Sequence, residues 1–174
     1  VFFQYPLIAI DDGYYLVVHP TLVFNQALDG LYRTCEELCG ETFHSEFADS
    51  FERYVGLVLG ELAGDNPLYT ESEIQATSPG RACDFAVECT DCIVLVECKS
   101  VRYSATLLTE NAIAKDNSTG KVADGFEQIH LTARRIKNGS LDGVLRNSRK
   151  PIFGFVVTFG DLRFANSPQY LSRF

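Results

Sequence analysis

The segment from Asp84 to Ser100 most constrains what this chain can fold into, because charged residues interrupt two short apolar runs there. Branched apolar residues on either side of a polar pair, Thr90 and Asp91, predict two strands joined by a tight turn. Acids and a lysine within a core strand cost several kcal/mol unless they pair with each other or hold a metal. The charged residues of this hairpin therefore need a functional explanation.

A two-residue turn sets the pairing of the two strands. The residue numbers of two cross-strand partners then add up to 181, so Asp84 faces Glu97. The Cβ atoms of such partners lie about 5 Å apart on one face of the sheet. Because side chains alternate, we expect Lys99 on that same face and Cys83 and Cys98 on the other. A longer loop remains an alternative, since Thr-Asp is not a favoured pair for a type I′ turn.

Two carboxylates and an amine at one point can be explained in two ways. Acids this close do not both stay ionised cheaply without a cation between them. Oxygen-rich sites with few protein ligands suit Mg²⁺ or Mn²⁺, which keep several waters and bind substrate phosphates. Lys99 would then position a water or neutralise developing charge. The alternative is a structural ion pair of Lys99 with Glu97 or Asp84.

An aspartate followed on the next strand by Glu97-Cys98-Lys99 resembles the PD-(D/E)XK nuclease superfamily, which includes restriction endonucleases, Holliday junction resolvases and phage-defence nucleases. The resemblance covers about residues 45–160 and implies an α/β fold. This is the αβββαβ restriction-endonuclease-like core, a central mixed sheet flanked by helices. The proline that usually precedes the aspartate is displaced upstream to Pro79, which is a departure from the pattern.

The expected elements follow that order. The first core helix is predicted at Ser45–Leu62, with Ser45 as its N-cap and Gly64 after its end. We divide the chain into an N-terminal extension, 1–40, containing a strand pair and a helix opened by Pro20, and a nuclease-like domain, 41–174. The polar segment after Ser100 is expected to cover the cleft or contact substrate. The remaining predicted elements are a short strand at Pro67–Ala76, a second core helix at Val122–Lys137 and a strand at Pro151–Phe159.

The resemblance also implies roles for individual residues of the hairpin. Asp84 and Glu97 would ligate Mg²⁺ or Mn²⁺, the Cys98 carbonyl would add a ligand, and Lys99 would orient the attacking water. The implied activity is that of a Mg²⁺-dependent deoxyribonuclease, expected to be an endonuclease, which hydrolyses DNA phosphodiester bonds in repair, restriction or defence. The alternative is a non-catalytic module of the same fold that binds nucleic acid or protein.

Two helical residues extend the implied site. Members of the superfamily often carry a glutamate on the first core helix that reaches the metal, and Glu52 is the match, with Glu61 as its rival and a solvated surface glutamate as the alternative. Some branches carry a glutamine on the second core helix, and Gln128 is the candidate there, or else an ordinary surface residue. Thr132 stands where those branches often have a tyrosine.

The distribution of charge bears on partners. The formal net charge is −8, but residues 1–98 carry −14 and residues 99–174 carry +6. A basic cluster in the second part could hold a phosphate backbone of DNA, or of RNA, which is not excluded. The alternative is a solvated helix end where basic groups complement the helix dipole. The cluster comprises Arg134, Arg135, Lys137, Arg146, Arg149 and Lys150, with Asp142 as the one acid among them.

Cysteines suggest other sites. Cys89 and Cys92 have zinc spacing, but a structural zinc site needs a second ligand pair, for which Cys35 and Cys39 are the candidates. A disulfide between Cys83 and Cys98 is geometrically conceivable. Reduced thiols that pack as small apolar groups are the preferred interpretation.

Hydropathy and the start of the chain bear on its location and on possible further domains. No apolar run approaches the ~20 residues of a membrane span, and no signal peptide is evident, so we expect a cytoplasmic protein without membrane contact. The chain starts at Val1 and has no methionine. We interpret this as an excised fragment or a sequence from which methionine positions are missing, so further domains of a larger chain are conceivable partners. A homodimer is also plausible, because double-strand cutters commonly pair two sites.

Overall fold

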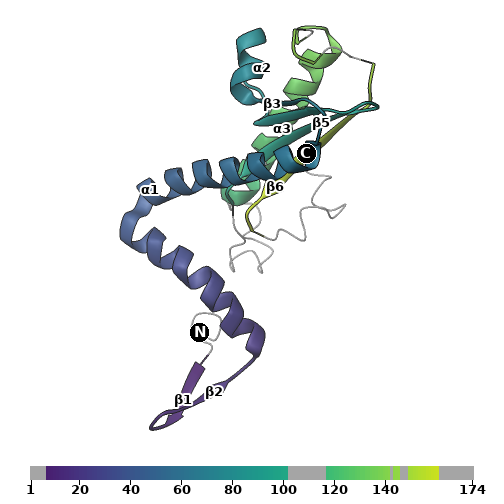
Figure 1. The fold of residues 1–174 in the computed structure, drawn as a ribbon. Helices are drawn as coiled ribbons and strands as arrows, with labels where there is room; N and C mark the ends of the chain where they lie inside the picture. The colour runs from purple at the N-terminus through teal and green to yellow at the C-terminus, as the bar shows by residue number, and fades with distance from the viewer. Residues whose placement is uncertain (1–6, 102–116, 142, 146–148, 161–174) are drawn as a thin grey trace. The chain divides into compact units, whose positions relative to one another are not determined.

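The computed structural model describes residues 7–101, 117–141, 143–145 and 149–160 (Figure 1). The chain divides into two units, Val1–Phe47 and Ala48–Phe174, which we describe separately. The elements, in chain order, are β1 (Leu7–Asp11), β2 (Tyr14–Val17), α1 (Pro20–Ala63), β3 (Leu68–Thr70), α2 (Glu71–Thr77), β4 (Phe85–Glu88), β5 (Ile93–Lys99), α3 (Asn117–Lys137) and β6 (Ile152–Thr158).

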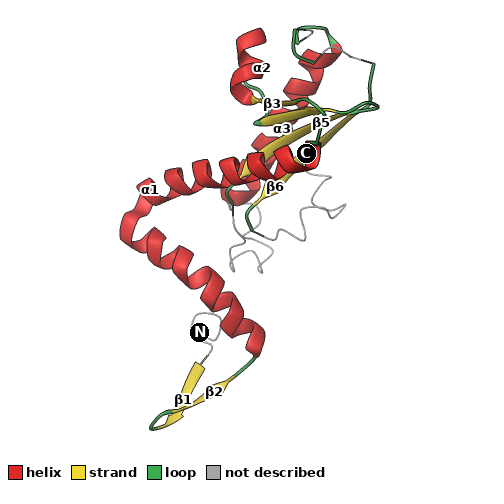
Figure 2. Ribbon diagram, in the orientation of Figure 1, coloured by secondary structure: helices red, strands yellow, loops and turns green. Residues whose placement is uncertain are grey.

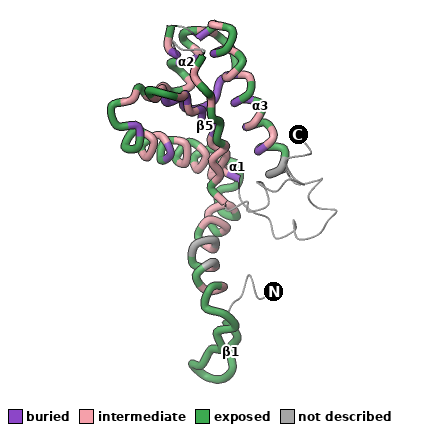
Figure 3. Tube along the Cα trace, turned by 90° about the vertical axis from the view of Figure 1, so that its right-hand side faces the viewer, coloured by how far each residue is buried: buried purple, intermediate pink, exposed green. Residues whose placement is uncertain are grey.

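The first unit contains a β-hairpin and helical turns of α1. β1 and β2 pair antiparallel, and α1 begins at Pro20, as the sequence predicts. The prediction that a helix begins at Ser45 is wrong, since α1 is already helical there. Its backbone departs from helical geometry at Gly40, where φ is 54°, a value that suits glycine because it has no Cβ. The apolar residues of the β1–β2 hairpin are exposed (Figure 3).

The second unit is a mixed α/β structure. Its four-stranded sheet has the order β3-β4-β5-β6, with antiparallel pairing up to β5 and parallel pairing between β5 and β6 (Figure 2). A mixed sheet flanked by helices is therefore confirmed. No helix among the described residues is long and apolar enough to cross a bilayer.

The predicted strand at Pro67–Ala76 is shorter than expected. Pairing stops at Thr70, and residues Glu71–Thr77 form α2 instead. Thr70 caps this helix, because Glu73 Oε2 accepts hydrogen bonds from the Thr70 amide at 2.7 Å and from the Thr70 hydroxyl at 2.8 Å. This reciprocal cap, with acids in the first helical turn, explains why the segment becomes helical.

The hairpin has the predicted register. Phe85 pairs with Val96 and Glu88 with Ile93, so that paired positions sum to 181. The Cys89 amide donates to the Cys92 carbonyl at 2.9 Å and closes the two-residue turn. Gly64, with φ at 57°, follows the last residue of α1 as predicted. α3 begins earlier than the predicted Val122 and ends at Lys137, and β6 lies within the predicted range.

Helices cover both faces of this sheet. On one face, Val55 of α1 packs with Phe85 and Val96. On the other face, Ile129 and Ile136 of α3 pack in a larger cluster with strand residues such as Leu95. Two glycines permit the close approach: a Cβ at Gly56 would lie 2.9 Å from the Phe85 ring, and one at Gly154 would collide with the Ile129 side chain. The helices therefore hold the hairpin firmly from both sides.

Candidate metal centre

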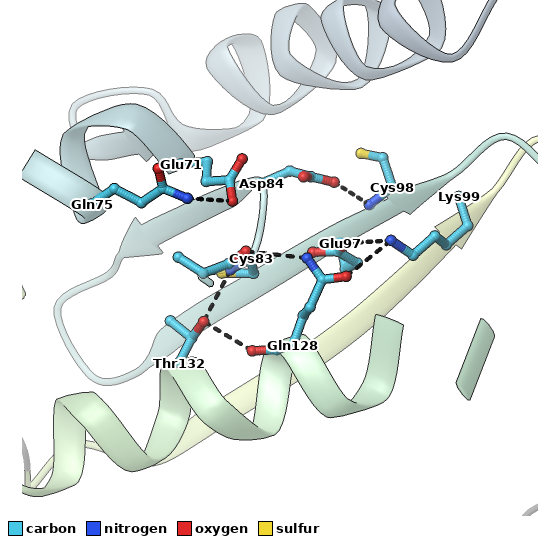
Figure 4. A network of polar contacts seen from close by, with 10 residues as sticks. Glu71, Gln75, Cys83, Asp84, Glu97, Cys98, Lys99, Gln128 and Thr132 are labelled. Atoms are coloured by element: carbon cyan, nitrogen blue, oxygen red, sulfur yellow. Dashed lines mark hydrogen bonds and ion pairs between the residues drawn. The ribbon is translucent and has the colours of Figure 1, made fainter. Parts of the chain in front are cut away.

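The open end of the hairpin is where β4 and β5 separate. The Ile93 amide donates to the Pro151 carbonyl at 2.9 Å, and the Lys99 carbonyl accepts from the Phe159 amide at 3.3 Å, so odd-numbered residues of β5 direct their backbone groups toward β6. Even-numbered residues, including Cys98, therefore direct theirs toward β4. Beyond the last paired residue, Phe85, the Cys98 amide instead donates to Asp84 Oδ2 at 2.6 Å (Figure 4). The Asp84 carboxylate thus substitutes for a strand partner.

Glu97 and Lys99 lie on the face covered by α3. Lys99 Nζ donates to Glu97 Oε1 at 2.5 Å and to Gln128 Oε1 at 3.1 Å (Figure 4). The Gln128 amide nitrogen donates in turn to the Ala82 carbonyl at 3.4 Å. Gln128 is therefore a buried link between the lysine and the segment that precedes Asp84.

One oxygen of this network is left without a partner. Glu97 is 1% exposed, and its Oε2 atom is buried without a hydrogen bond of regular geometry from the described part of the chain; the Asp84 amide lowers the pKa of Glu97 only as the smallest of several influences. An unsatisfied buried acceptor costs about 1–3 kcal/mol, and more when it carries charge. A ligand at the open end of the hairpin would supply the partner that this oxygen lacks.

The electrostatics of the acids agree with that conclusion. Burial raises the pKa of Glu97 to about 7, and the nearby Asp84 charge adds to this, while the Lys99 hydrogen bond opposes it. Burial also raises the pKa of Asp84, against the opposing effect of the Cys98 amide and Lys99. The pKa of Glu52 on α1 is raised by burial and then by the Asp84 charge, which places it electrostatically beside the site. A bound cation would favour the ionised form of all three acids.

The residues present fit a hard divalent cation with few protein ligands. The described residues contain no ready group of three or more His, Cys, Asp or Glu side chains that could hold a metal. The available donors are the Asp84 and Glu97 carboxylates and the Cys98 carbonyl, which points to the same side of β5 as its amide. Mg²⁺ is held in this way, by one or two carboxylates together with waters and substrate phosphates.

The structure thus brings together Asp84, Glu97, Cys98, Lys99 and Gln128, with Glu52 nearby. Glu61, the rival glutamate on α1, is exposed.

Cys83 does not lie where its alternation with Asp84 suggests. It packs in the cluster beneath α3 with Leu95, on the face that also carries Glu97, whereas Cys98 packs on the α1 face. The prediction that both cysteines face away from the acids is therefore wrong for Cys83. The reason is that β4 begins only at Phe85, so the strand alternation does not extend back to it. All six cysteines are free thiols, so Cys83 and Cys98 form no disulfide.

Several residues of the predicted basic cluster have internal roles. Arg135 donates to the carbonyls of Ser78 and Arg81, the latter at 2.9 Å. Lys150 forms an ion pair with Glu88 at 3.1 Å and donates to the Cys89 carbonyl at 2.8 Å. These side chains fasten loops to the body of the unit. Arg146, Asp142 and the segment 102–116, for which we expected contacts with substrate, lie outside the described residues.

Gly125, which the sequence pattern did not single out, lies against the site. A Cβ at this buried position of α3 would lie 3.3 Å from both Glu97 Cγ and Lys99 Cε, and 3.2 Å from a Val156 methyl. Glycine therefore lets α3 approach the charged pair. The available signal was a glycine three residues before Gln128, on the same face of the helix.

The chain was also compared with known proteins. No protein-family model, no curated protein and no solved structure matches it.

Proposed function

We propose that the unit Ala48–Phe174 is a Mg²⁺- or Mn²⁺-dependent nuclease that hydrolyses phosphodiester bonds of DNA. The observation that carries this proposal is the buried, unpartnered Oε2 atom of Glu97, close to the Asp84 carboxylate at the open end of the hairpin. Most buried side-chain oxygens are satisfied within the protein, so an unpartnered one in an ion pair supports a role beyond structure.

The arrangement of elements supports the restriction-endonuclease-like αβββαβ core. The order α1, β3, β4, β5, α3, β6 has the same sequence of helices and strands, with α2 as an insertion after β3. The antiparallel β4–β5 hairpin and the parallel β5–β6 pair give the mixed sheet that this core requires. Asp84 precedes one central strand, and Glu97 and Lys99 belong to the next.

Each residue has a role in the proposed chemistry. Asp84, Glu97 and the Cys98 carbonyl would hold the ion, with Glu52 supporting it from α1. When bound, the ion supplies stabilisation of phosphate charge and acidification of a water. The Lys99 ammonium orients the water or stabilises charge on the phosphate. Gln128 holds the lysine in place through the 3.1 Å contact.

The test is cleavage of nucleic acid by the purified chain. Supercoiled DNA, linear DNA and RNA are incubated with Mg²⁺, with Mn²⁺ or with a chelator. We expect metal-dependent cleavage of DNA that is lost in Lys99→Ala and in Asp84→Ala. Lys150→Ala is the matched control, because it removes a lysine from the other Lys–Glu pair of the same hairpin. Cleavage that survives both site variants would refute the proposal, and cleavage of RNA alone would reassign the substrate.

A second candidate is a non-catalytic module of this fold that binds another macromolecule. It is favoured by the large apolar side chains that the first unit exposes, among them Ile10, Tyr14 and Leu38. This candidate predicts binding without turnover, and it would be preferred if the chain binds Mn²⁺ or DNA but cleaves no nucleic acid.

A further inference from the structure

We propose that Thr132 of α3 is a positioning residue that keeps the β4–β5 hairpin open at the metal centre. This inference rests on the proposed function, because it explains how the Cys98 carbonyl and the Asp84 carboxylate both become available to an ion. Thr132 touches neither substrate nor metal in this role. It acts through the backbone of Cys83.

The register of the hairpin shows what Thr132 prevents. Cys89 and Cys92 form a hydrogen-bonded pair, and such pairs recur at every second position of an antiparallel ladder. Phe85 and Val96 are therefore a pair of this kind, and the next would join Cys83 to Cys98. In the structure the Cys98 amide bonds to Asp84 Oδ2 at 2.6 Å instead.

The other half of that pair is taken by Thr132. The Cys83 amide donates to Thr132 Oγ1 at 2.9 Å, and the Thr132 hydroxyl donates to the Gln128 carbonyl at 2.9 Å (Figure 4). Thr132 is fully buried, so water does not compete for these groups. The hydroxyl thus accepts one hydrogen bond and donates another, and it draws the Cys83 backbone toward α3.

The consequence for the site is direct. With its amide committed to Thr132, Cys83 does not donate to the Cys98 carbonyl, which would be its partner in a continued ladder. Continuing the ladder would also return the Cys98 amide to Cys83 and release Asp84 from β5. One buried hydroxyl therefore controls two of the proposed ligands.

Gln128 connects this device to Lys99. Its backbone carbonyl accepts from Thr132, while its side chain contacts both Lys99 and the Ala82 carbonyl. α3 thus holds the segment 82–83 by two contacts, one from each residue. The same turn of helix both opens the hairpin and orients the lysine.

The experiment compares Thr132→Val with Thr132→Ser in the full chain. Valine keeps the volume but has no acceptor for the Cys83 amide, whereas serine keeps the hydroxyl. We expect Thr132→Val to weaken Mn²⁺ binding, measured calorimetrically, by at least about tenfold, while Thr132→Ser stays within about twofold of the wild type. Ile136→Val is the matched control, since it trims a buried residue one turn further along α3 without a hydrogen bond to the hairpin.

A second readout needs no metal. Amide ¹⁵N NMR of the metal-free chain should show a changed hydrogen-bonded state of the Cys83 and Cys98 amides in Thr132→Val, and no such change in Thr132→Ser or Ile136→Val. If Thr132→Val is too unstable to study, Thr132→Cys, which has a much weaker acceptor, replaces it with the same expected direction.

The outcomes separate the two proposals. Unchanged Cys83 and Cys98 amides in the folded Thr132→Val chain would overturn the role of Thr132. Wild-type Mn²⁺ affinity in that variant would overturn it as well. If the wild-type chain itself binds no Mn²⁺, the proposed function fails, and the amide readout still decides whether Thr132 holds the hairpin open.

Discussion

The two ends of the β4–β5 hairpin each carry a Lys–Glu pair. The pairs differ in how deeply the glutamate is buried and in whether all its oxygens have hydrogen-bond partners. At the closed end, Lys150 lies 3.1 Å from Glu88, both side chains are 16% exposed, and Lys150 also bonds to the Cys89 carbonyl. At the open end, Lys99 lies 2.5 Å from Glu97, whose side chain is 1% exposed and keeps an unpartnered oxygen.

The comparison sets a structural ion pair beside the pair that we propose to be functional. The closed-end pair fastens Lys150, two residues before β6, to the turn of the hairpin, and both side chains are partly exposed. At the open end the lysine is 19% exposed, so the difference lies in Glu97, which is buried near Asp84, where burial raises the pKa of both acids. Identical residue types thus have different roles because their surroundings differ.

Replacing Glu97 or Glu88 by glutamine, one at a time, should give the largest difference between the two ion pairs. Glu97→Gln keeps the shape but removes a proposed ligand charge, so we expect Mn²⁺ affinity and DNA cleavage to fall by about 10²- to 10³-fold. Glu88→Gln should leave both within about twofold. Calorimetry and a plasmid-nicking assay measure the two effects, and equal losses in both variants would remove the distinction.

The pH dependence of the free energy of unfolding should follow the titration of the Glu97 carboxyl group. Its pKa in the folded chain, about 7, lies above the ordinary value of 4.5, so between these values the folded state holds the proton that the unfolded state has released. The stabilisation is complete below about pH 4.5 and is lost as the pH rises through 7, by up to roughly 3 kcal/mol. Urea unfolding with a chelator should show this decline in the wild type and in Glu88→Gln. A decline just as steep in Glu97→Gln would argue against it.

Metal ions should reverse that loss. At pH 7.5, Mn²⁺ at a hundred times its dissociation constant should stabilise the folded chain by about 2.7 kcal/mol. Differential scanning calorimetry would detect the rise in melting temperature. Asp84→Asn should show little or no rise, because the variant lacks a ligand charge, and a rise equal to that of the wild type would place the ion elsewhere.

Two glycines of α3 offer a smaller and matched test. Gly125→Ala forces a Cβ to 3.3 Å from Glu97 Cγ and Lys99 Cε, so we expect about tenfold less cleavage and a cost of about 1–2 kcal/mol in stability. Gly120→Ala meets no atom within 4 Å and should instead stabilise the helix by up to about 1 kcal/mol. Thermal unfolding and nicking assays check both, and a harmless Gly125→Ala would show that α3 can move away from the pair.

The weakest effect is expected from the closed-end lysine. Lys150→Met removes an ion pair and a hydrogen bond that water partly screens, so the free energy of unfolding should fall by about 0.5–1 kcal/mol with unchanged cleavage. Chemical denaturation measures the loss. A large drop in activity would mean that the closed end also serves the site.

Local contacts explain which structural predictions were correct. The register of the hairpin follows from a two-residue turn and from side-chain alternation over a few positions, and the end of α1 follows from Gly64. Two predictions were wrong for local reasons: a helix-capping signal was overlooked, and strand alternation was extended beyond the end of a strand. Helix α2 depends on the Thr70–Glu73 cap, and the face of Cys83 depends on where β4 begins.

The chain's local pattern was sufficient to set Phe85 opposite Val96 and to put Glu97 and Lys99 on one face of β5, because a short turn and the pleat of two strands dictate those neighbours. It did not determine the position of Asp84, which precedes the first residue of β4. The contacts of α3 could not be read in this way. Gln128 meets Lys99 across 29 positions and Thr132 meets Cys83 across 49, and the glycines at 125 and 154 leave room for the helix to dock closely on the sheet. Such contacts depend on how distant surfaces pack together, which no local periodicity encodes.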